Sequence, residues 1–251
     1  MKCLIFLLAL ALIISSCETR KSTSIGNPPM EGFDLAHSDP AAIELADSIM
    51  LAMGGRENWD NTRFISWNAF GRRNWVWDKK MNRIRIENLK DSIIYLASIN
   101  SDEVRVQVKG QELKEPDSLK KMLKKAKSMY FNDMYWLAMP YKLKDSGVTL
   151  KYLGEDTLKG NRYNVLQLMF QEVGDTPENK YKLYVDVKEK LVRYWSYYKD
   201  SRQDTANFTL PWDNYQKYGN ILLSGDRTGG RGPKNVKVDE MLPDKLFTEF
   251  Q

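Results

Sequence analysis

Cysteine and histidine are nearly absent from this sequence of 251 residues. The two cysteines, Cys3 and Cys17, lie near the start of the chain, and the single histidine is His37. The rest of the chain therefore has no thiol for a disulfide or a thiolate metal ligand. A zinc site, or a Ser–His or Cys–His nucleophile pair, is very hard to build from one histidine. We expect no metal and no cofactor, and we interpret His37 as a surface residue.

A strong excess of one charge is also missing. Lysine and arginine number 38 against 33 aspartate and glutamate residues, so the net charge is +5. The two signs alternate through most of the chain, unlike the concentrated basic surface of a nucleic-acid-binding protein. We therefore expect no nucleic-acid partner. The apolar fraction of 42% is enough for a sizeable core, and the length fits one domain.

The longest apolar run is at the N-terminus. Lys2 precedes a continuous apolar stretch that ends at Ser15-Ser16, directly before Cys17. A charged start, an apolar middle and small residues at the end are typical of a secretory signal segment. The stretch is shorter than the roughly 20 residues that a transmembrane helix needs. We predict that residues 1–16 are a signal peptide.

Ile14-Ser15-Ser16-Cys17 resembles the bacterial lipoprotein box, in which the chain is cut before the cysteine. The resemblance implies a mature chain that begins at Cys17 and carries acyl chains, such as palmitate, on that residue. It implies a lipid-anchored protein of the cell envelope. The residues after Cys17 lack an obvious acidic export tract, so we expect an outer-membrane anchor that faces the periplasm. Residues 17–37, rich in Ser, Thr, Pro, Gly and Asn, have the composition of a flexible tether.

The sequence after residue 37 predicts antiparallel β-structure with two main helices. Asp39 and Pro40 begin a helix whose apolar residues recur at helical spacing until Gly54-Gly55. A second helix is predicted over residues 116–139, and its last turns are apolar or aromatic nearly all round. Short strands separated by turn residues are predicted at 64–70, 73–78, 81–88, 92–98, 103–109, 149–155, 162–172, 180–187 and 191–199. Sequential hairpins with one apolar face indicate an antiparallel meander.

This order of elements resembles a known superfamily. The motifs that carry the resemblance, besides the lipoprotein box, are Met53-Gly54-Gly55, Trp136-Leu137-Ala138-Met139-Pro140, and the hairpin of Tyr184-Val185-Asp186 with Leu191-Val192-Arg193. They resemble the outer-membrane lipoprotein-sorting (LolA/LolB-like) superfamily, and more closely a branch of lipoproteins with a DUF6503-type domain. The resemblance extends over residues 40–249.

The resemblance implies an α+β fold that is mainly β. A curved antiparallel sheet would form an unclosed barrel, with helices covering its concave side. The domain would span residues 38–251, and its cavity would accept acyl chains or another apolar ligand. The resemblance brings no catalytic motif, so we do not expect an enzyme.

Aromatic residues are abundant, with seven Trp and 13 Tyr. Several fall on the predicted inner faces of strands, and others lie at the apolar end of the second helix. Aromatic walls and adaptable methionines suit a pocket for apolar molecules. We predict a hydrophobic ligand pocket formed by Trp67, Trp75, Trp77, Tyr95, Met129, Tyr135, Trp136, Met139 and Trp195.

Two alternative functions remain open. The same large side chains could fill the core of a structural envelope protein. The same shell could also be a hydrolase that uses carboxylates, but these lie in or beside predicted turns: Glu155, Asp156, Asp186, Asp200 and Asp204.

Two further segments have more than one interpretation. The second helix has a lysine-rich face, which is either a solvated surface or a patch that meets anionic lipid: Lys120, Lys121, Lys124, Lys125 and Lys127. The glycine-rich segment 224–233 hints at a phosphate-binding loop, but it lacks the Gly-Lys-Ser/Thr ending. We interpret it as a mobile loop.

Overall fold

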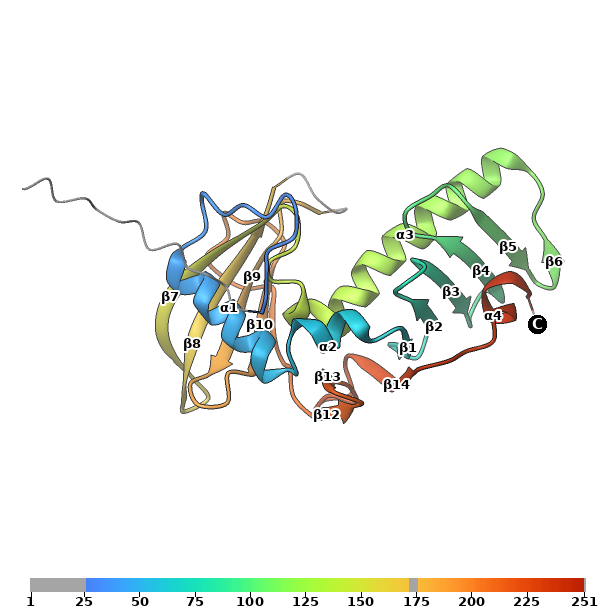
Figure 1. Cartoon of the computed structure of the whole chain (residues 1–251). Coiled ribbons are helices and arrows are strands. Elements are labelled where there is room, and N and C mark those ends of the chain that lie inside the picture. The colour runs from blue at the N-terminus through green and yellow to red at the C-terminus, as the bar shows by residue number, and fades with distance from the viewer. Residues whose placement is uncertain (1–25, 172–175, 251) are drawn as a thin grey trace, which may run out of the picture.

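The computed structural model describes residues 26–171 and 176–250 (Figure 1). The predicted signal peptide and the lipidation site at Cys17 lie outside the described residues. Seven strands form the first sheet, in the order β14-β1-β2-β3-β4-β5-β6. Their bounds are β1 (Phe64–Ala69), β2 (Arg73–Asp78), β3 (Arg83–Asn88), β4 (Ile93–Ser98), β5 (Val104–Val108), β6 (Gln111–Glu112) and β14 (Pro233–Asp239).

A second sheet has five strands in the order β11-β10-β9-β8-β7, and a two-stranded ribbon pairs β12 with β13. Their bounds are β7 (Val148–Leu158), β8 (Asn161–Phe170), β9 (Lys180–Asp186), β10 (Val192–Tyr198), β11 (Phe208–Pro211), β12 (Tyr215–Tyr218) and β13 (Ile221–Ser224). Neighbouring strands are antiparallel throughout these sheets. The predicted class is confirmed: the chain is mainly β, and its antiparallel sheets do not close into a barrel.

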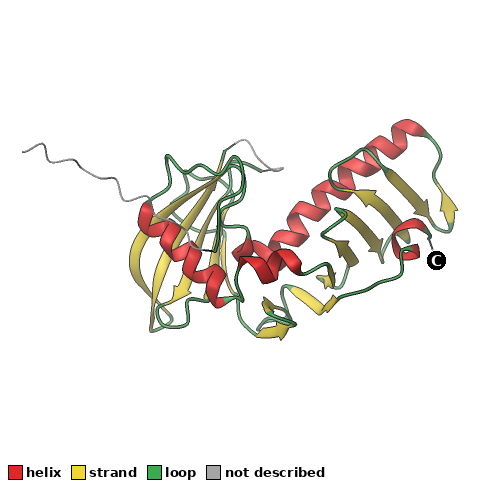
Figure 2. Cartoon of the chain, in the orientation of Figure 1, coloured by secondary structure: helices red, strands yellow, loops and turns green. Residues whose placement is uncertain are grey.

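The helices are α1 (Pro40–Ala52), α2 (Arg56–Asn61), α3 (Pro116–Ala138) and α4 (Lys245–Thr248), with a short 3-10 turn, η1 (Met139–Tyr141). Helix α3 packs against β4 and β5 of the first sheet, whereas α1 lies against β7 of the second (Figures 1 and 2). The strands therefore form two main sheets where the sequence predicts one. The division falls between β6 and β7, because α3 and η1 occupy the chain there and carry it from one sheet to the other. Within the described residues, no helix is both long and apolar enough to cross a bilayer.

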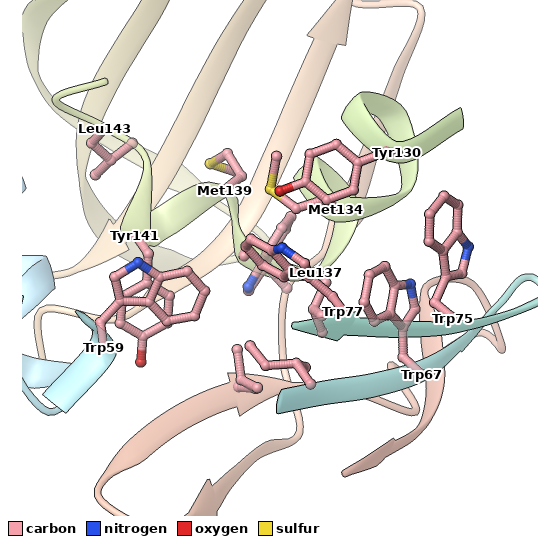
Figure 3. Packing of buried hydrophobic residues seen from close by; sticks show 14 of the residues in the cluster. Trp59, Trp67, Trp75, Trp77, Tyr130, Met134, Leu137, Met139, Tyr141 and Leu143 are labelled. Carbon is pink, nitrogen blue, oxygen red and sulfur yellow. The ribbon is translucent and has the colours of Figure 1, made fainter. Parts of the chain in front are cut away.

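The core of the first sheet is a row of side chains in direct register across five strands. Trp67 faces Trp75, Trp75 faces Ile86, Ile86 faces Tyr95, and Tyr95 faces Val106. All five are buried, as the period-2 rule requires for one face of a sheet. The indoles of Trp67 and Trp75 stack with ring centroids 5.3 Å apart (Figure 3).

The first described residues are attached to the second sheet. Asp34 and Asp39 donate their backbone N–H groups to the carbonyls of Val148 and Leu150 on β7. The Asp34 carboxylate also accepts a hydrogen bond from Thr149 Oγ1 at 2.9 Å. Residues 26–37, part of the segment predicted as a tether, therefore lie against the body of the protein as a series of turns. The remainder of that segment, residues 17–25, lies outside the described residues.

The C-terminal segment lies on the opposite face of the first sheet from α3. Arginines of β3 hold it there: Arg83 Nη1 lies 2.7 Å from the Asp244 carboxylate, and Arg85 Nη1 donates to the carbonyl of Glu249 at 2.8 Å. Phe247 of α4 stacks on Phe64 with ring centroids 6.1 Å apart. The first sheet is thus covered in part on both faces, by α3 on one side and by the C-terminal segment on the other.

Candidate functional site

A hollow of about 1070 Å³ lies between the two sheets, along the C-terminal half of α3. Its lining comes from β2 on one side, from β8 to β11 on the other, and from α3 and the segment after η1 between them. We call it the aromatic hollow, because its lining contains Trp77, Tyr130, Phe131, Tyr135, Trp136, Phe170, Tyr181, Trp195, Tyr197 and Phe208. Methionines at positions 30, 129 and 134, with Ile99 and Val148, add further apolar side chains to the lining.

One wall of the hollow is a continuous set of rings on the second sheet. Tyr181 and Phe208 both face Tyr197 in the strand register, so the three share one face of β9, β10 and β11. Tyr181 stacks on Trp195 at 5.4 Å between ring centroids, and Tyr197 stacks on Phe208 at 5.0 Å. The three rings of this row remain half-buried, whereas Leu183 and Val185, further along the same face of β9, are fully buried. The sheet therefore presents an aromatic end that other elements do not fully cover.

Helix α3 contributes Tyr135 and Trp136 to the same set of rings. Trp136 lies edge-on to Trp195 at 4.6 Å between centroids, and Tyr135 lies 5.7 Å from Tyr181. The surface that these rings offer is mainly carbon, because Tyr135 Oη and the indole nitrogen of Trp195 are themselves buried. Among the described residues neither atom has a hydrogen-bond partner.

The lining carries little net charge. Burial raises the pKa of Tyr135, and it raises the pKa of Tyr181 to about 12, so both phenols are neutral at physiological pH. The charged residues of the lining are paired: Asp145, its one carboxylate within the described residues, forms an ion pair with Lys142, and Arg73 forms one with the buried Asp133. An apolar or weakly polar molecule therefore suits this hollow better than an ion.

The nine residues predicted for the pocket divide into two groups. Five line the aromatic hollow: Trp77, Met129, Tyr135, Trp136 and Trp195. The other four are packed in the core and do not line it: Trp67, Trp75, Tyr95 and Met139. Trp75 has a structural role, since its indole N–H donates to the buried Asp133 carboxylate at 2.9 Å.

The prediction omitted four aromatic residues of the wall: Phe170, Tyr181, Tyr197 and Phe208. The sequence did contain a signal for Tyr181 and Tyr197. Each lies two positions from an apolar residue of a predicted strand, Leu183 or Trp195, and therefore on the same face of that strand. Phe208 lies in a tail for which the sequence predicts only loops and short strands. Its position became clear only through its pairing with Tyr197.

The carboxylates considered for hydrolysis do not line the aromatic hollow. Glu155 pairs with Arg162, and Asp200 pairs with Arg202. Asp186 accepts the backbone N–H groups of the turn after β9. Within the described residues, no group of three or more Asp, Glu, His or Cys side chains is arranged to hold a metal ion. His37 is exposed, as predicted, and its Nδ1 lies 2.8 Å from Asp34.

The glycine-rich segment 224–233, interpreted from the sequence as a mobile loop, is attached to the body of the protein at Arg227, whereas residues 228–231 are exposed. Arg227 is buried, with its guanidinium 3.5 Å from the ring centroid of Trp212. Its Nη2 donates to the carbonyl of Trp136 in the last turn of α3. A cation at a helix C-terminus satisfies an otherwise free carbonyl and complements the helix dipole. This segment therefore supports the helix that borders the hollow.

Comparison with known proteins gives the family. A family of unknown function, DUF6503, matches residues 89–227, which is more than half of the chain. The chain belongs to the DUF6503 family. The matched part includes all of α3 and the second sheet, and hence most of the aromatic hollow. No curated protein matches this DUF6503 sequence.

Three solved structures are similar to this DUF6503 protein. A DUF1329 family protein from Desulfovibrio piger is 15% identical, with a TM-score of 0.44 over 84% of this chain and 98% of that one. A structure described as an outer membrane lipoprotein-sorting protein domain, from Vibrio parahaemolyticus, is 9% identical. Its TM-score is 0.40 over 82% of this chain and 96% of that one. A LolA superfamily protein from Nitrosomonas europaea is 13% identical, with a TM-score of 0.38 over 81% of this chain and 97% of that one.

Proposed function

We propose that this protein is a lipid-anchored binding protein of the cell envelope, which holds an acyl chain or another hydrophobic molecule in the aromatic hollow. The observation that carries the proposal is the row of half-buried rings on the second sheet, Tyr181, Tyr197 and Phe208, beside a hollow of about 1070 Å³. Such rings keep apolar area in contact with water, and a bound ligand removes that contact. The hollow is at the upper end of the size range of small-molecule sites.

The anchor belongs to the same proposal. The signal-like segment 1–16 and the lipoprotein box before Cys17 support attachment to a membrane, with the outer membrane and its periplasmic side as the proposed location. Mass spectrometry of the N-terminal peptide tests it: a mature chain that begins at an acylated Cys17, without residues 1–16, is expected. An unmodified, uncleaved N-terminus in the wild-type protein would contradict the anchor without touching the proposal for the hollow.

Ligand binding can be tested with a fluorescent fatty acid, cis-parinaric acid, and a matched pair of variants. Tyr197 faces the hollow, whereas Tyr194 lies on the opposite face of the same strand. We expect Tyr197→Ala and Phe208→Ala each to weaken binding by roughly tenfold, because each removes part of an apolar wall. Tyr194→Ala should leave the affinity unchanged.

Two outcomes would count against the proposed function. Wild-type protein that takes up no probe would favour a structural protein with a filled core. Equal losses of affinity in Tyr197→Ala and Tyr194→Ala would mean that the probe does not occupy the hollow. Native mass spectrometry of the purified wild-type protein adds a second measurement, in which we expect a co-purified apolar molecule.

A further inference from the structure

One face of α3 changes character along the helix. Residues 120, 124, 131 and 135 follow one another at intervals of four and seven positions, which places them in a single stripe on the helix surface. The stripe begins with Lys120 and Lys124, continues with Phe131 and ends with Tyr135. The lysines are exposed, whereas Phe131 and Tyr135 line the aromatic hollow. The basic half of the helix therefore leads directly to the edge of the hollow.

The lysines of this face are not neutralised. Lys120, Lys121, Lys124 and Lys125 are exposed, and among the described residues none of them has a carboxylate at ion-pair distance. The chain contains no acidic residue from position 118 to position 132. Lysines just outside the group do have partners: Lys114 Nζ lies 2.7 Å from Glu112 and Lys127 Nζ donates to the carbonyl of Ser101 at 2.8 Å. We call the four unpaired residues the lysine face.

The exposed side chain of Phe131 favours one class of negatively charged partner over the others. It is a large apolar side chain with 42% of its surface exposed, and it lies on the stripe of the lysine face. A bilayer offers negative headgroups and, directly below them, an apolar phase that accepts a phenyl ring. A nucleic acid or an acidic protein surface matches the charge but provides no such apolar phase for an exposed phenyl ring at the edge of the hollow.

We propose that the lysine face and Phe131 form a docking surface for an anionic lipid bilayer, which places the mouth of the aromatic hollow at the lipid surface. This inference goes beyond the proposed function, because docking needs no ligand in the hollow. In this proposal the first half of α3 contacts the lipid headgroups, and its last turns border the site where an apolar molecule would enter.

The test compares two sets of four substitutions that remove the same charge. The first replaces the lysine face, Lys120, Lys121, Lys124 and Lys125, with Gln. The control replaces four exposed lysines that are scattered over other elements, Lys188, Lys199, Lys217 and Lys237, with Gln. All proteins carry the full chain with Cys17→Ser, so that no acyl chain holds them on the membrane and the N-terminal segment contributes equally to each.

Binding is measured by co-sedimentation with two kinds of vesicle, one of phosphatidylcholine alone and one of equal parts phosphatidylcholine and phosphatidylglycerol. We expect the otherwise wild-type protein to prefer the anionic vesicles, and this preference to weaken with added salt. The lysine-face variant should lose roughly 10²–10³-fold in partition coefficient on them, from the contribution of each lysine near an anionic surface. The control set should lose much less.

Phe131 has its own matched control in Leu153, which is exposed to a similar extent, 44%, on β7 of the second sheet. Phe131→Ala should weaken binding to both kinds of vesicle by a few fold, and Leu153→Ala should not. Cis-parinaric acid binding in solution separates the two proposals. The lysine-face variant should keep its affinity for the probe, because none of its four positions lines the hollow.

Three results would overturn the docking proposal. Equal losses in the lysine-face and control sets would show that net charge alone matters. No preference of the otherwise wild-type protein for anionic vesicles would remove the lipid surface as the partner. Binding to single-stranded DNA as tight as binding to anionic vesicles would assign the patch to polyanions in general. Circular dichroism and thermal unfolding confirm that each variant is folded, since surface Lys→Gln changes have small effects on stability.

Discussion

Arg73 of β2 and Asp133 of α3 form a bidentate ion pair that attaches the helix to the first sheet. Arg73 Nε lies 2.6 Å from one carboxylate oxygen of Asp133, and Arg73 Nη2 lies 2.8 Å from the other. The Asp133 side chain is fully buried, and the indole N–H of Trp75 donates to it as well. A buried carboxylate with this many donors fixes the rotation of the helix about its axis. That rotation aims Tyr135 at the second sheet.

We expect Asp133→Asn to destabilise the protein by roughly 3 kcal/mol, because it leaves the Arg73 guanidinium without its counter-ion in a partly buried site. Urea unfolding followed by circular dichroism measures the change. Asp117→Asn is the control, since Asp117 is exposed in the first turn of the same helix. A loss similar to that of the control would show that the pair does not hold the helix.

Because of Lys79, we expect the stability of the folded protein to depend on pH. Its ammonium group lies 3.7 Å from the ring centroid of Trp59, and burial lowers the pKa of Lys79 to about 7. The unfolded chain, with a lysine pKa near 10.5, therefore binds more protons than the folded one between these two values. Stability from this group rises with pH through that range and is lowest below pH 7.

Lys79→Met should therefore stabilise the protein most below pH 7, and the gain should shrink as the pH rises toward 10. Urea midpoints measured at a series of pH values test this. Lys80→Met provides the control, because Lys80 is exposed next to it. A difference between wild type and Lys79→Met that stays constant across the pH range would contradict the lowered pKa.

Asp34 holds the first described segment on β7. Burial acts to raise its pKa, but hydrogen bonds from His37 and Thr149 outweigh burial and keep the pKa of Asp34 below its ordinary 3.8. The attachment it provides is therefore present above pH 3.8 and is lost as the pH falls through the lower, folded-state value. Asp34→Ala should raise amide hydrogen exchange in residues 26–38 while exchange in the first sheet stays unchanged. Glu31→Ala, an exposed neighbour, should have no such effect, and equal exchange in both variants would contradict the role of Asp34.

Arg227 should stabilise the end of α3. Arg227→Met keeps apolar contact with Trp212 but removes the donor to the Trp136 carbonyl, so we expect a loss of about 2 kcal/mol. Urea unfolding measures it, with Arg231→Met as the exposed control in the same segment. We also expect weaker cis-parinaric acid binding, since Trp136 lines the hollow. Unchanged stability would show that the segment does not support the helix.

Much of the local structure could be read from the sequence. The Asp39-Pro40 start of α1 is confirmed, and each predicted strand from residue 64 to residue 109 corresponds to one of β1 to β5. Alternation placed Trp75 and Trp77 on one face, and both are buried. The aromatic end of the second predicted helix, apolar nearly all round, indicated a helix covered on several sides. In the structure this end of α3 lies between the two sheets.

The candidate site could be predicted only in part, because the sequence shows which face a side chain is on but not what covers that face. Trp75 and Trp195 look alike as strand residues, yet α3 seals the first in the core while the second borders a hollow. Phe208 joined the wall through pairing with a distant strand.

The sequence by itself determined the mainly β class, helices α1 and α3, strands β1 to β5 and β7 to β10, and their apolar faces, because period, turn residues and caps act over a few neighbouring positions. The tertiary structure decided that the strands divide into two sheets and that α3 crosses between them. It also decided which aromatic rings remain partly open. Those outcomes depend on contacts between residues far apart in the chain, such as Arg73 with Asp133, and local sequence patterns do not specify such contacts.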